Sequence, residues 1–258
     1  QVASVLSHSI DSNGYFQVTL DLHDAFGLTS DQIADALFNE SKITLGQVAS
    51  ALYYGIDKGD ITQVAKDLSK GTKASLNDIA TELYNYLEKQ NSVQVAKDLS
   101  KVDGASLSDV ASALYNGIDK QNSNQVAADL NNPYGIGANV DDTAKALYEG
   151  ISGETTRQIA ANLYYGAGYG LGFPSFTQIA TALYNLNSGE TTGQIAADLY
   201  KGAGASLDQV ASAIHDGIKG ETDLQVAADL YYGVGGVTLN QVASALYNGI
   251  KQEYSGQV

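Results

Sequence analysis

One pattern of apolar and polar positions recurs along most of the chain. In the phrase TLGQVASALYYGI, which starts at Thr44, apolar residues return every three or four positions, the spacing of one face of an α-helix. The residues that share this face are Leu45, Val48, Leu52 and Ile56. The phrase therefore predicts a short helix with one apolar side. Such a helix must pack against neighbours, because an isolated helix of about ten residues is only marginally stable in water.

Near-copies of this phrase follow one another at intervals of mostly 15 or 16 residues, counted from the Gln or Asp before each Val-Ala or Ile-Ala pair. Two versions alternate, type A similar to QVASALYNGI and type B similar to QVAADLY or QVAKDLS. One copy of each spans about 31 residues, enough for two short helices and two loops. The pattern predicts an all-α fold, a right-handed α-solenoid of short two-helix repeats, each an αα-hairpin.

The alternation of the two types is interrupted near the N-terminus. The phrase at Gln17 resembles type B, whereas the phrases at Gln32 and Gln47 both resemble type A, with no type B copy between them. We therefore expect the phase of the repeat to change there. The expected regions are irregular repeats over 1–46 with a phase break near 39–46, and a regular array over 47–258 whose last repeat is incomplete.

Each predicted helix begins with a recognisable cap. A short polar residue stands three positions before the anchoring Gln or Asp, which is the spacing of a capping box. Thirteen residues match: Thr44, Ser75, Ser106, Asn139, Ser175, Ser206 and Thr238 in type A, and Asp60, Asn91, Asn122, Thr155, Thr191 and Thr222 in type B. Capping explains the repeated Gln without any ligand.

A glycine follows most Leu-Tyr pairs, or their equivalents, by two residues. These glycines are Gly55, Gly117, Gly150, Gly217 and Gly249 in type A, and Gly166, Gly202 and Gly233 in type B. Because glycine adopts the left-handed conformation readily, we expect it to end each helix there.

Tyrosines are the part of the phrase that helix formation does not explain. An aromatic residue stands six positions after most type A anchors, on the edge of the apolar face. There it can bury its ring for packing, or it can form a contact surface for another subunit or a glycan. Adjacent Tyr-Tyr pairs cannot both face one core, so we expect some rings to be exposed. The candidate interface comprises Tyr53, Tyr54, Tyr84, Tyr115, Tyr148, Tyr164, Tyr165, Tyr184, Tyr231, Tyr232 and Tyr247.

An aspartate stands four positions after most type B anchors, although aspartate is a poor residue for the interior of a helix. The candidate acidic ladder comprises Asp67, Asp98, Asp129, Asp198 and Asp229, and Asn162 interrupts it. One explanation is structural: each carboxylate accepts hydrogen bonds from the loop or cap of an adjacent hairpin. The alternative is a ladder of cation sites, with calcium as the candidate ion.

Composition narrows the classes of partner. The 258 residues include 29 Asp and Glu against 14 Lys and Arg, a formal net charge of −15. Such a surface repels phosphate backbones and anionic lipids, so we expect neither nucleic-acid binding nor membrane insertion. The chain has no Cys and no Met. Resistance to oxidation favours an extracellular or cell-surface location, where the sequon at Asn39 could carry a glycan.

The usual residues of catalytic centres are scarce. His8, His23 and His215 share no spacing, no Cys is present, and Arg157 is the only arginine. A zinc centre of His and Cys is therefore excluded by count, and no nucleophile–base arrangement stands out. The sequence predicts a protein that is not an enzyme and carries no cofactor.

The phrase TLNQVASALYNGI resembles the opening helix of TAL-effector DNA-binding repeats, with Leu, Gln and Val before a turn that contains Gly. That resemblance would imply a DNA-binding solenoid. The acidic charge and the few basic residues contradict DNA binding, so we assign no family.

The two ends of the sequence suggest how copies could join. Gln1 and Val2 open a helix phrase without its cap, and Gln257 and Val258 begin another. Uncapped apolar faces favour head-to-tail contacts between identical subunits. We expect a non-enzymatic extracellular structural protein that self-assembles end to end into a filament, sheath or surface layer. The alternative is an adhesin-like binding module that recognises a peptide, a glycan or a cell-surface protein on its Tyr-lined face.

Overall fold

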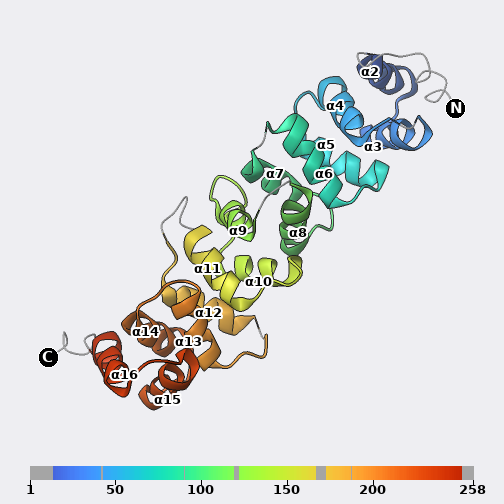
Figure 1. The fold of residues 1–258 in the computed structure, drawn as a ribbon. Coiled ribbons are helices and arrows are strands. Elements are labelled where there is room, and N and C mark those ends of the chain that lie inside the picture. The colour runs from blue at the N-terminus through green and yellow to red at the C-terminus, as the bar shows by residue number, and fades with distance from the viewer. Residues whose placement is uncertain are drawn as a thin grey trace. The chain divides into compact units, whose positions relative to one another are not determined.

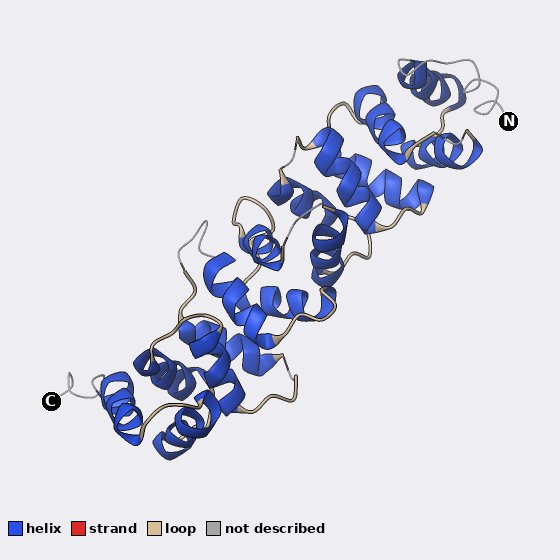
Figure 2. Cartoon of the chain, in the orientation of Figure 1, coloured by secondary structure: helices blue, strands red, loops and turns tan. Residues whose placement is uncertain are grey.

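Helices make up the regular structure of the chain. A computed structural model describes residues 14–41, 43–89, 91–118, 122–166, 173–186 and 188–251. Within these ranges the helices are joined by loops and no strand occurs (Figure 2). The predicted all-α class is thus confirmed. The chain divides into two compact units, residues 1–121 and 122–258, a division that differs from the boundary expected after residue 46.

The described part of the first unit contains seven α-helices, three of which continue into a π-helical turn (Figure 1). These are α2 (Gly14–Phe26), α3 (Ser30–Asp35) with η1 (Ala36–Glu40), α4 (Leu45–Gly55), α5 (Ile61–Asp67) with η2 (Leu68–Thr72), α6 (Leu76–Glu82) with η3 (Leu83–Leu87), α7 (Ser92–Leu99) and α8 (Leu107–Gly117).

The second unit continues the same alternation of short helices and loops. Its described helices are α9 (Ser123–Asn131), α10 (Val140–Gly150), α11 (Thr156–Gly166), α12 (Phe176–Asn185), α13 (Thr192–Lys201), α14 (Leu207–Gly217), α15 (Asp223–Ala228) with η5 (Asp229–Val234), and α16 (Leu239–Leu246) with η6 (Tyr247–Lys251).

Helices pack in two rows within each unit. Each helix contacts its successor in the sequence and also the helix after that. The first row consists of α2, α4, α6 and α8 in one unit and of α10, α12, α14 and α16 in the other. The second row consists of α3, α5 and α7, and of α9, α11, α13 and α15 with η5.

The row contacts correct the assignment of the first two described helices. The phrase at Gln17 resembles type B, yet α2 packs on α4 in the first row. The phrase at Gln32 resembles type A, yet α3 packs on η2 in the second row. The phase break expected near 39–46 assumed that the phrase at Gln17 is type B and the phrase at Gln32 type A. The contacts instead show first-row and second-row helices alternating both before and after that segment.

The predicted helix starts are confirmed. All thirteen capping residues accept a hydrogen bond from the backbone N–H of the anchoring Gln or Asp. With a threonine or serine cap the Gln side chain also reaches back, as Gln47 Oε1 does to Thr44 N at 3.0 Å. Each cap contributes about 1 kcal/mol, so the repeated polar pair fixes where each helix begins.

The glycines that follow the Leu-Tyr pairs mark helix ends as expected in α4, α8, α10, α11 and α14, but the left-handed conformation expected there is wrong. None of them has a positive φ; the left-handed glycines lie in the loops, for example Gly153 and Gly189. A Cβ on Gly117 would overlap the Asn77 carbonyl, and a Cβ on Gly217 would lie 2.9 Å from the Thr177 oxygen. These glycines therefore allow successive helices of one row to approach closely.

The core consists of the apolar stripe and the alanines beside it. Val48 and Leu52 of the opening phrase are fully buried, and so are their counterparts in the later helices, such as Val110 and Leu114. Burying one such side chain contributes about 2 kcal/mol. The alanine next to the stripe is fully buried in α4, α6, α8, α12 and α14, which leaves little space between helices for a ligand.

Candidate functional sites: an aromatic groove and a row of carboxyl clusters

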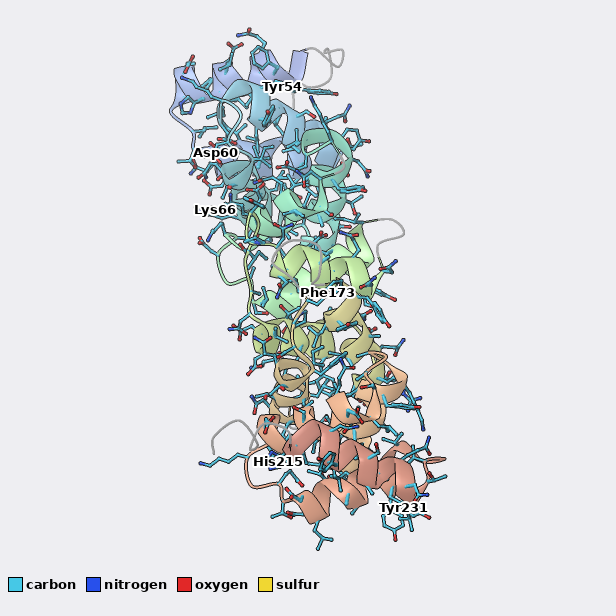
Figure 3. The ribbon with its side chains drawn as sticks, turned by 90° about the vertical axis from the view of Figure 1, so that its left-hand side faces the viewer. Tyr54, Asp60, Lys66, Phe173, His215 and Tyr231 are labelled. Atoms are coloured by element: carbon cyan, nitrogen blue, oxygen red, sulfur yellow. The ribbon has the colours of Figure 1, made fainter. Side chains whose placement is uncertain are left out.

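The tyrosines of the candidate interface divide into packed and exposed rings. Tyr53, Tyr84 and Tyr164 are partly buried. The exposed ones are Tyr54, Tyr115, Tyr148, Tyr165, Tyr184, Tyr231, Tyr232 and Tyr247. Figure 3 marks Tyr54 in the first unit and Tyr231 in the second. Exposure makes these rings available for contact, and it does not by itself show a partner.

Each adjacent pair of tyrosines is arranged edge to face. The ring centroids of Tyr164 and Tyr165 are 5.1 Å apart at 81°, and Tyr164 also stacks on Phe176 at 4.7 Å. Tyr164 thus fixes the end of α11 against α12, while Tyr165 is left half exposed. The expectation that the pairs cannot both face one core is confirmed here.

An open groove of about 850 Å³ lies in the first unit. Its walls come from α2, α4 and η3, and its residues are Tyr15, Phe16, Thr44, Gly46, Gln47, Ser50, Ala51, Tyr54 and Tyr86. Tyr54 and Tyr86 are the most exposed of its rings, at 66% and 63%. The groove offers aromatic faces beside a few uncharged hydrogen-bonding groups, the composition that suits a small uncharged ligand.

Of the tyrosines in the candidate interface, Tyr54 lines the groove. Tyr53 and Tyr84, which stand six positions after their anchors, are partly buried and are not among its lining residues. Tyr86 stands two residues later, and the absent side chain of Gly46 makes room for its ring, since a Cβ there would lie 3.2 Å from Tyr86 Cε2. The sequence signal for Tyr86 was its departure from the repeat, in NYL where other copies have NGI.

A second recurring feature joins the acidic ladder to an acid in the preceding loop. In four of the five clusters the residue four positions after the second-row anchor meets the loop acid and a hydroxyl from the first turn of the previous second-row helix. In the fifth, the Ser30 hydroxyl contacts the loop acid Asp57, and Asp57 faces Asp67. The clusters are named by their ladder residue: Asp67 (with Ser30 and Asp57), Asp98 (with Thr62 and Glu88), Asn162 (with Ser123 and Glu154), Asp198 (with Thr156 and Glu190) and Asp229 (with Thr192 and Glu221).

In the Asp198 cluster, one hydroxyl lies between two carboxyl groups. Thr156 Oγ1 is 2.5 Å from Glu190 Oε1 and 2.7 Å from Asp198 Oδ2. Arg157 Nε lies 3.3 Å from the other Asp198 oxygen. Burial raises the pKa of Glu190, and the Asp198 charge adds to that rise, while the Thr156 hydrogen bond and Arg157 oppose it.

The Asp98 cluster has the same plan without an arginine. Thr62 Oγ1 donates to Asp98 Oδ1, and Gln94 Nε2 donates to Asp98 Oδ2 at 3.1 Å. Burial, followed by a hydrogen bond with Asp98 and its charge, raises the pKa of Glu88 to about 8. A small cavity of about 340 Å³ adjoins the pair, and Asp60 also lines it.

The Asn162 cluster replaces one carboxyl with an amide. Asn162 Nδ2 donates to Ser123 Oγ at 2.9 Å and also to Glu154 Oε1. Ser123 in turn forms a hydrogen bond with Glu154. Burial raises the pKa of Glu154, whereas its hydrogen bonds with Ser123 and Asn162 lower it. The two amide hydrogens and one hydroxyl hydrogen close this cluster completely.

The structural explanation for the ladder fits its hydrogen bonds. Asp67, Asp98 and Asp129 accept from the anchoring Gln of their own helix, and Asp98 and Asp198 also accept from the preceding helix of their row. Within the described ranges, no three His, Cys, Asp or Glu side chains are arranged to hold a metal ion. The calcium alternative therefore gains no support from these residues.

The loop acids were missed in the sequence, although a signal exists. In the second unit each follows a left-handed glycine and precedes the cap, in the repeated tripeptide Gly-Glu-Thr. In the first unit Asp57 and Glu88 stand six residues before the anchor. The signal is hidden because loops vary in length, whereas the helix phrases do not.

Neither of the described histidines faces a hydroxyl nucleophile. His215 Nδ1 lies 2.7 Å from Asp216 and Nε2 lies 3.6 Å from Asp223, so carboxylates occupy both ring nitrogens. His23 Nδ1 is within 3.0 Å of the Leu28 carbonyl. Neither ring is arranged as the base of a nucleophile–base pair.

The candidate subunit join lies outside the described residues, as does His8; its members are Gln1, Val2, Gln257 and Val258. Asn39, the sequon residue, is exposed, and its Nδ2 donates to Asp35 Oδ1 at 2.6 Å.

Comparison with known protein families, with characterised proteins and with solved structures finds no significant match. In the part of the chain that the structure describes, no helix is both long and apolar enough to cross a membrane. The function must therefore be argued from the residues themselves.

Proposed function

We propose that the chain is a non-enzymatic structural repeat protein, an α-solenoid of two-helix repeats, that self-assembles end to end outside the cell into a filament, sheath or surface layer. The two rows of helices within each unit support the solenoid architecture. The right-handed sense of its superhelix stays a prediction.

The observation that carries the proposal is an exposed face on α15 and α16. Leu224 is 80% exposed and Leu239 68%, and Ala228 and Ala243 are exposed beside them. In earlier first-row helices the alanine equivalent to Ala243 is fully buried. In α14, for example, this alanine is Ala211, which the next helix of the row covers: a Cβ added to Gly249 after α16 would lie 3.1 Å from it. The face of α15 and α16 therefore has the character of one that a further repeat covers.

A second copy of the chain can supply that repeat. Within each unit the interfaces between successive helices of a row are formed by near-copies of one phrase, so the same molecule contains surfaces that pack on a helix of this type. Contact between two different faces of identical subunits is heterologous and propagates in one direction. Stacking of copies on this face would therefore extend the array into a filament.

Assembly in solution tests the proposal. Sedimentation velocity and electron microscopy over a rising concentration series should show extended oligomers for the unaltered chain and mainly monomers for Ala243→Asp. Tyr134→Asp is the matched control, because Tyr134 is an exposed loop residue of the same unit; this variant should assemble normally. A monomeric unaltered chain at high concentration, or assembly that Ala243→Asp leaves intact, would overturn the proposal.

The groove between α2, α4 and η3 favours a second candidate function, a module that binds a glycan or peptide. Tyr54 and Tyr86 offer two exposed ring faces, and Ser50 and Gln47 offer uncharged polar groups between them. Aromatic faces beside such groups suit the mixed apolar and hydroxyl surface of a sugar. Binding on a glycan array should be lost in Tyr54→Ala and kept in Tyr165→Ala, an exposed tyrosine of the other unit. No binding by the unaltered chain, or equal loss in both variants, would count against this function.

A further inference from the structure

In the second row, a hydroxyl group can lie within hydrogen-bond distance of two carboxyl groups although it has only one hydrogen to donate. In the Asp198 cluster, Thr156 Oγ1 lies within hydrogen-bond distance of oxygens from both Glu190 and Asp198. A hydroxyl group has one hydrogen, and an ionised carboxylate has none. One of the two contacts therefore needs a further proton, carried by a carboxyl group.

Two further clusters, Asp98 and Asp229, bring two acids together in a similar way. In the Asp229 cluster, Thr192 lies beside both Glu221 and Asp229, and each acid has a buried oxygen without a partner, Glu221 Oε2 and Asp229 Oδ2. Glu88 and Asp98 line the same small cavity, and a hydrogen bond between their carboxyl groups requires a proton on one of them.

Buried carboxyl oxygens that have no hydrogen-bond partner also indicate an additional proton. Each loop acid that faces an aspartate has one such oxygen: Asp57 Oδ2, Glu88 Oε1, Glu190 Oε2 and Glu221 Oε2. Neither Glu154 nor Asn162 has one. An unsatisfied acceptor is costly on a charged carboxylate and less costly on a protonated carboxyl group.

In the Asn162 cluster an amide hydrogen occupies the position of the additional proton. Its amide donates to Glu154 at the position where an aspartate faces the loop acid in the other clusters. Asparagine has nearly the same shape as a protonated aspartic acid, with an N–H where the acid has an O–H. We propose that each of the clusters Asp98, Asp198 and Asp229 holds one shared proton in the folded chain, and that the second row is consequently most stable in mild acid and loosens as the pH rises above neutral.

The charged groups that surround the clusters set the order in which they lose this proton. Glu88 shares its small cavity with Asp98 and Asp60, and no described Lys, Arg or His side chain lines that cavity. Glu190 faces Arg157 as well as Asp198. Around Glu221 the groups are Asp229 and the hydroxyl of Thr192. Arg157 favours the ionised form, so the Asp198 cluster should release its proton at lower pH than the Asp98 cluster.

The direction of the pH effect follows from the tighter binding of the proton in the folded state. An unfolded glutamate titrates near about 4.3, whereas the pKa of Glu88 in the folded chain is about 8. The stabilisation by this proton is therefore complete below the unfolded value and is lost as the pH rises through the folded one. Between the two values, folding takes up a proton.

A reciprocal exchange of Asp and Asn tests the proposal. The melting temperature of the unaltered chain should fall between pH 5 and pH 8.5, by about 3 °C or more. Asp98→Asn supplies the missing N–H and should flatten this dependence, and Asn162→Asp creates a new two-acid cluster and should steepen it. Asn116→Asp, which adds an acid at an exposed helical position, is the control and should leave the slope unchanged. A slope that is flat or opposite in the unaltered chain, or equal in Asp98→Asn, would overturn the proposal.

A spectroscopic readout keeps the test decisive if a variant fails to fold. The side-chain carboxyl ¹³C resonance of Glu88, assigned by its loss in Glu88→Gln, should titrate with a midpoint several pH units above that of an unfolded glutamate. A midpoint near about 4.3 in the folded, unaltered protein would show that the cluster holds no proton at neutral pH.

Discussion

The Asn162 and Asp198 clusters occupy successive places in the same row of helices and differ mainly in one group. Each has a hydroxyl at the start of the earlier helix and a glutamate after a left-handed glycine, Gly153 or Gly189. One has an amide at the ladder position and the other has a carboxyl group. The amide closes its cluster with its own hydrogens, whereas the carboxyl group needs a proton from solvent or a nearby cation.

This difference shows how a uniform scaffold can carry chemistry that is not uniform. The backbone, the caps and the close glycine contacts are the same at both places, so packing does not distinguish them. A single atom at the end of one side chain decides whether the interface depends on pH.

Removal of the close helix contact should have the largest effect and should affect both clusters alike. Gly166 and Gly202 place α11 on α9 and α13 on α11, and a Cβ at either would overlap a backbone carbonyl of the preceding helix. Gly166→Val and Gly202→Val should each lower the free energy of unfolding by about 2–4 kcal/mol, because the helices must separate. Urea unfolding should show similar losses at pH 5 and pH 8. The exposed neighbour Lys201→Ala is the control, and a strongly pH-dependent loss in either valine variant would contradict a role in packing.

Exchange of the amide and the carboxyl group should have the next largest effect, and only at high pH. Asn162→Asp removes a donor and brings two carboxylates together, which should cost about 1–3 kcal/mol at pH 8. At pH 5 the new acid can be protonated, so most of the loss should disappear. Asp198→Asn should show the opposite behaviour and unfold with less dependence on pH than the unaltered chain. Equal losses for Asn162→Asp at both pH values would show that the two clusters do not differ by a proton.

Removal of the hydroxyl should separate the clusters further. Thr156→Val deletes the hydroxyl between two acids and should cost about 1–2 kcal/mol at pH 8, since an unsatisfied buried acceptor remains. Ser123→Ala should cost less, because Asn162 still donates to Glu154. The two variants can be compared by chemical denaturation in one buffer. A larger loss for Ser123→Ala would contradict the hydrogen-bond count.

The smallest effect is expected from the arginine. Arg157 is half exposed, so its ion pair with Asp198 should contribute below about 1 kcal/mol and should weaken with salt. In Arg157→Gln the proton of the Asp198 cluster should be held to higher pH, which steepens the fall in stability between pH 7 and pH 8.5. A loss that is large and insensitive to salt would indicate that the arginine packs rather than compensates charge.

The sequence was sufficient to predict the helices but not the contacts between successive helices of one row. The cap residues and the anchoring Gln fix each start locally, so Thr44 and its counterparts were predicted correctly. The role of Gly117 or Gly202 depends on a carbonyl about 40 residues away. A glycine that ends a helix and a glycine that allows close approach occupy the same position in the phrase, so the pattern alone could not separate them.

The assignment of α3 to the wrong row has a physical cause. The ladder aspartate of a second-row helix accepts a hydrogen bond from the helix before it in that row, as Asp98 does from Thr62. Among the described residues no second-row helix precedes α3, and it has Ala36 at the ladder position. Without the aspartate the phrase at Gln32 resembles type A, although its place in the packing is that of type B. The groove was missed for a related reason, because Tyr86 lies where η3 departs from the repeat.

The most direct test of the shared proton is the number of protons released when the chain unfolds at pH 7. Calorimetric unfolding in two buffers of different ionisation enthalpy gives this number without any substitution. The shared protons predict a net release of between about one and three protons per chain, at most one from each of the clusters Asp98, Asp198 and Asp229, since carboxyl groups with a raised pKa give up their protons on unfolding. Unfolding that releases no protons, or takes them up, would contradict the account.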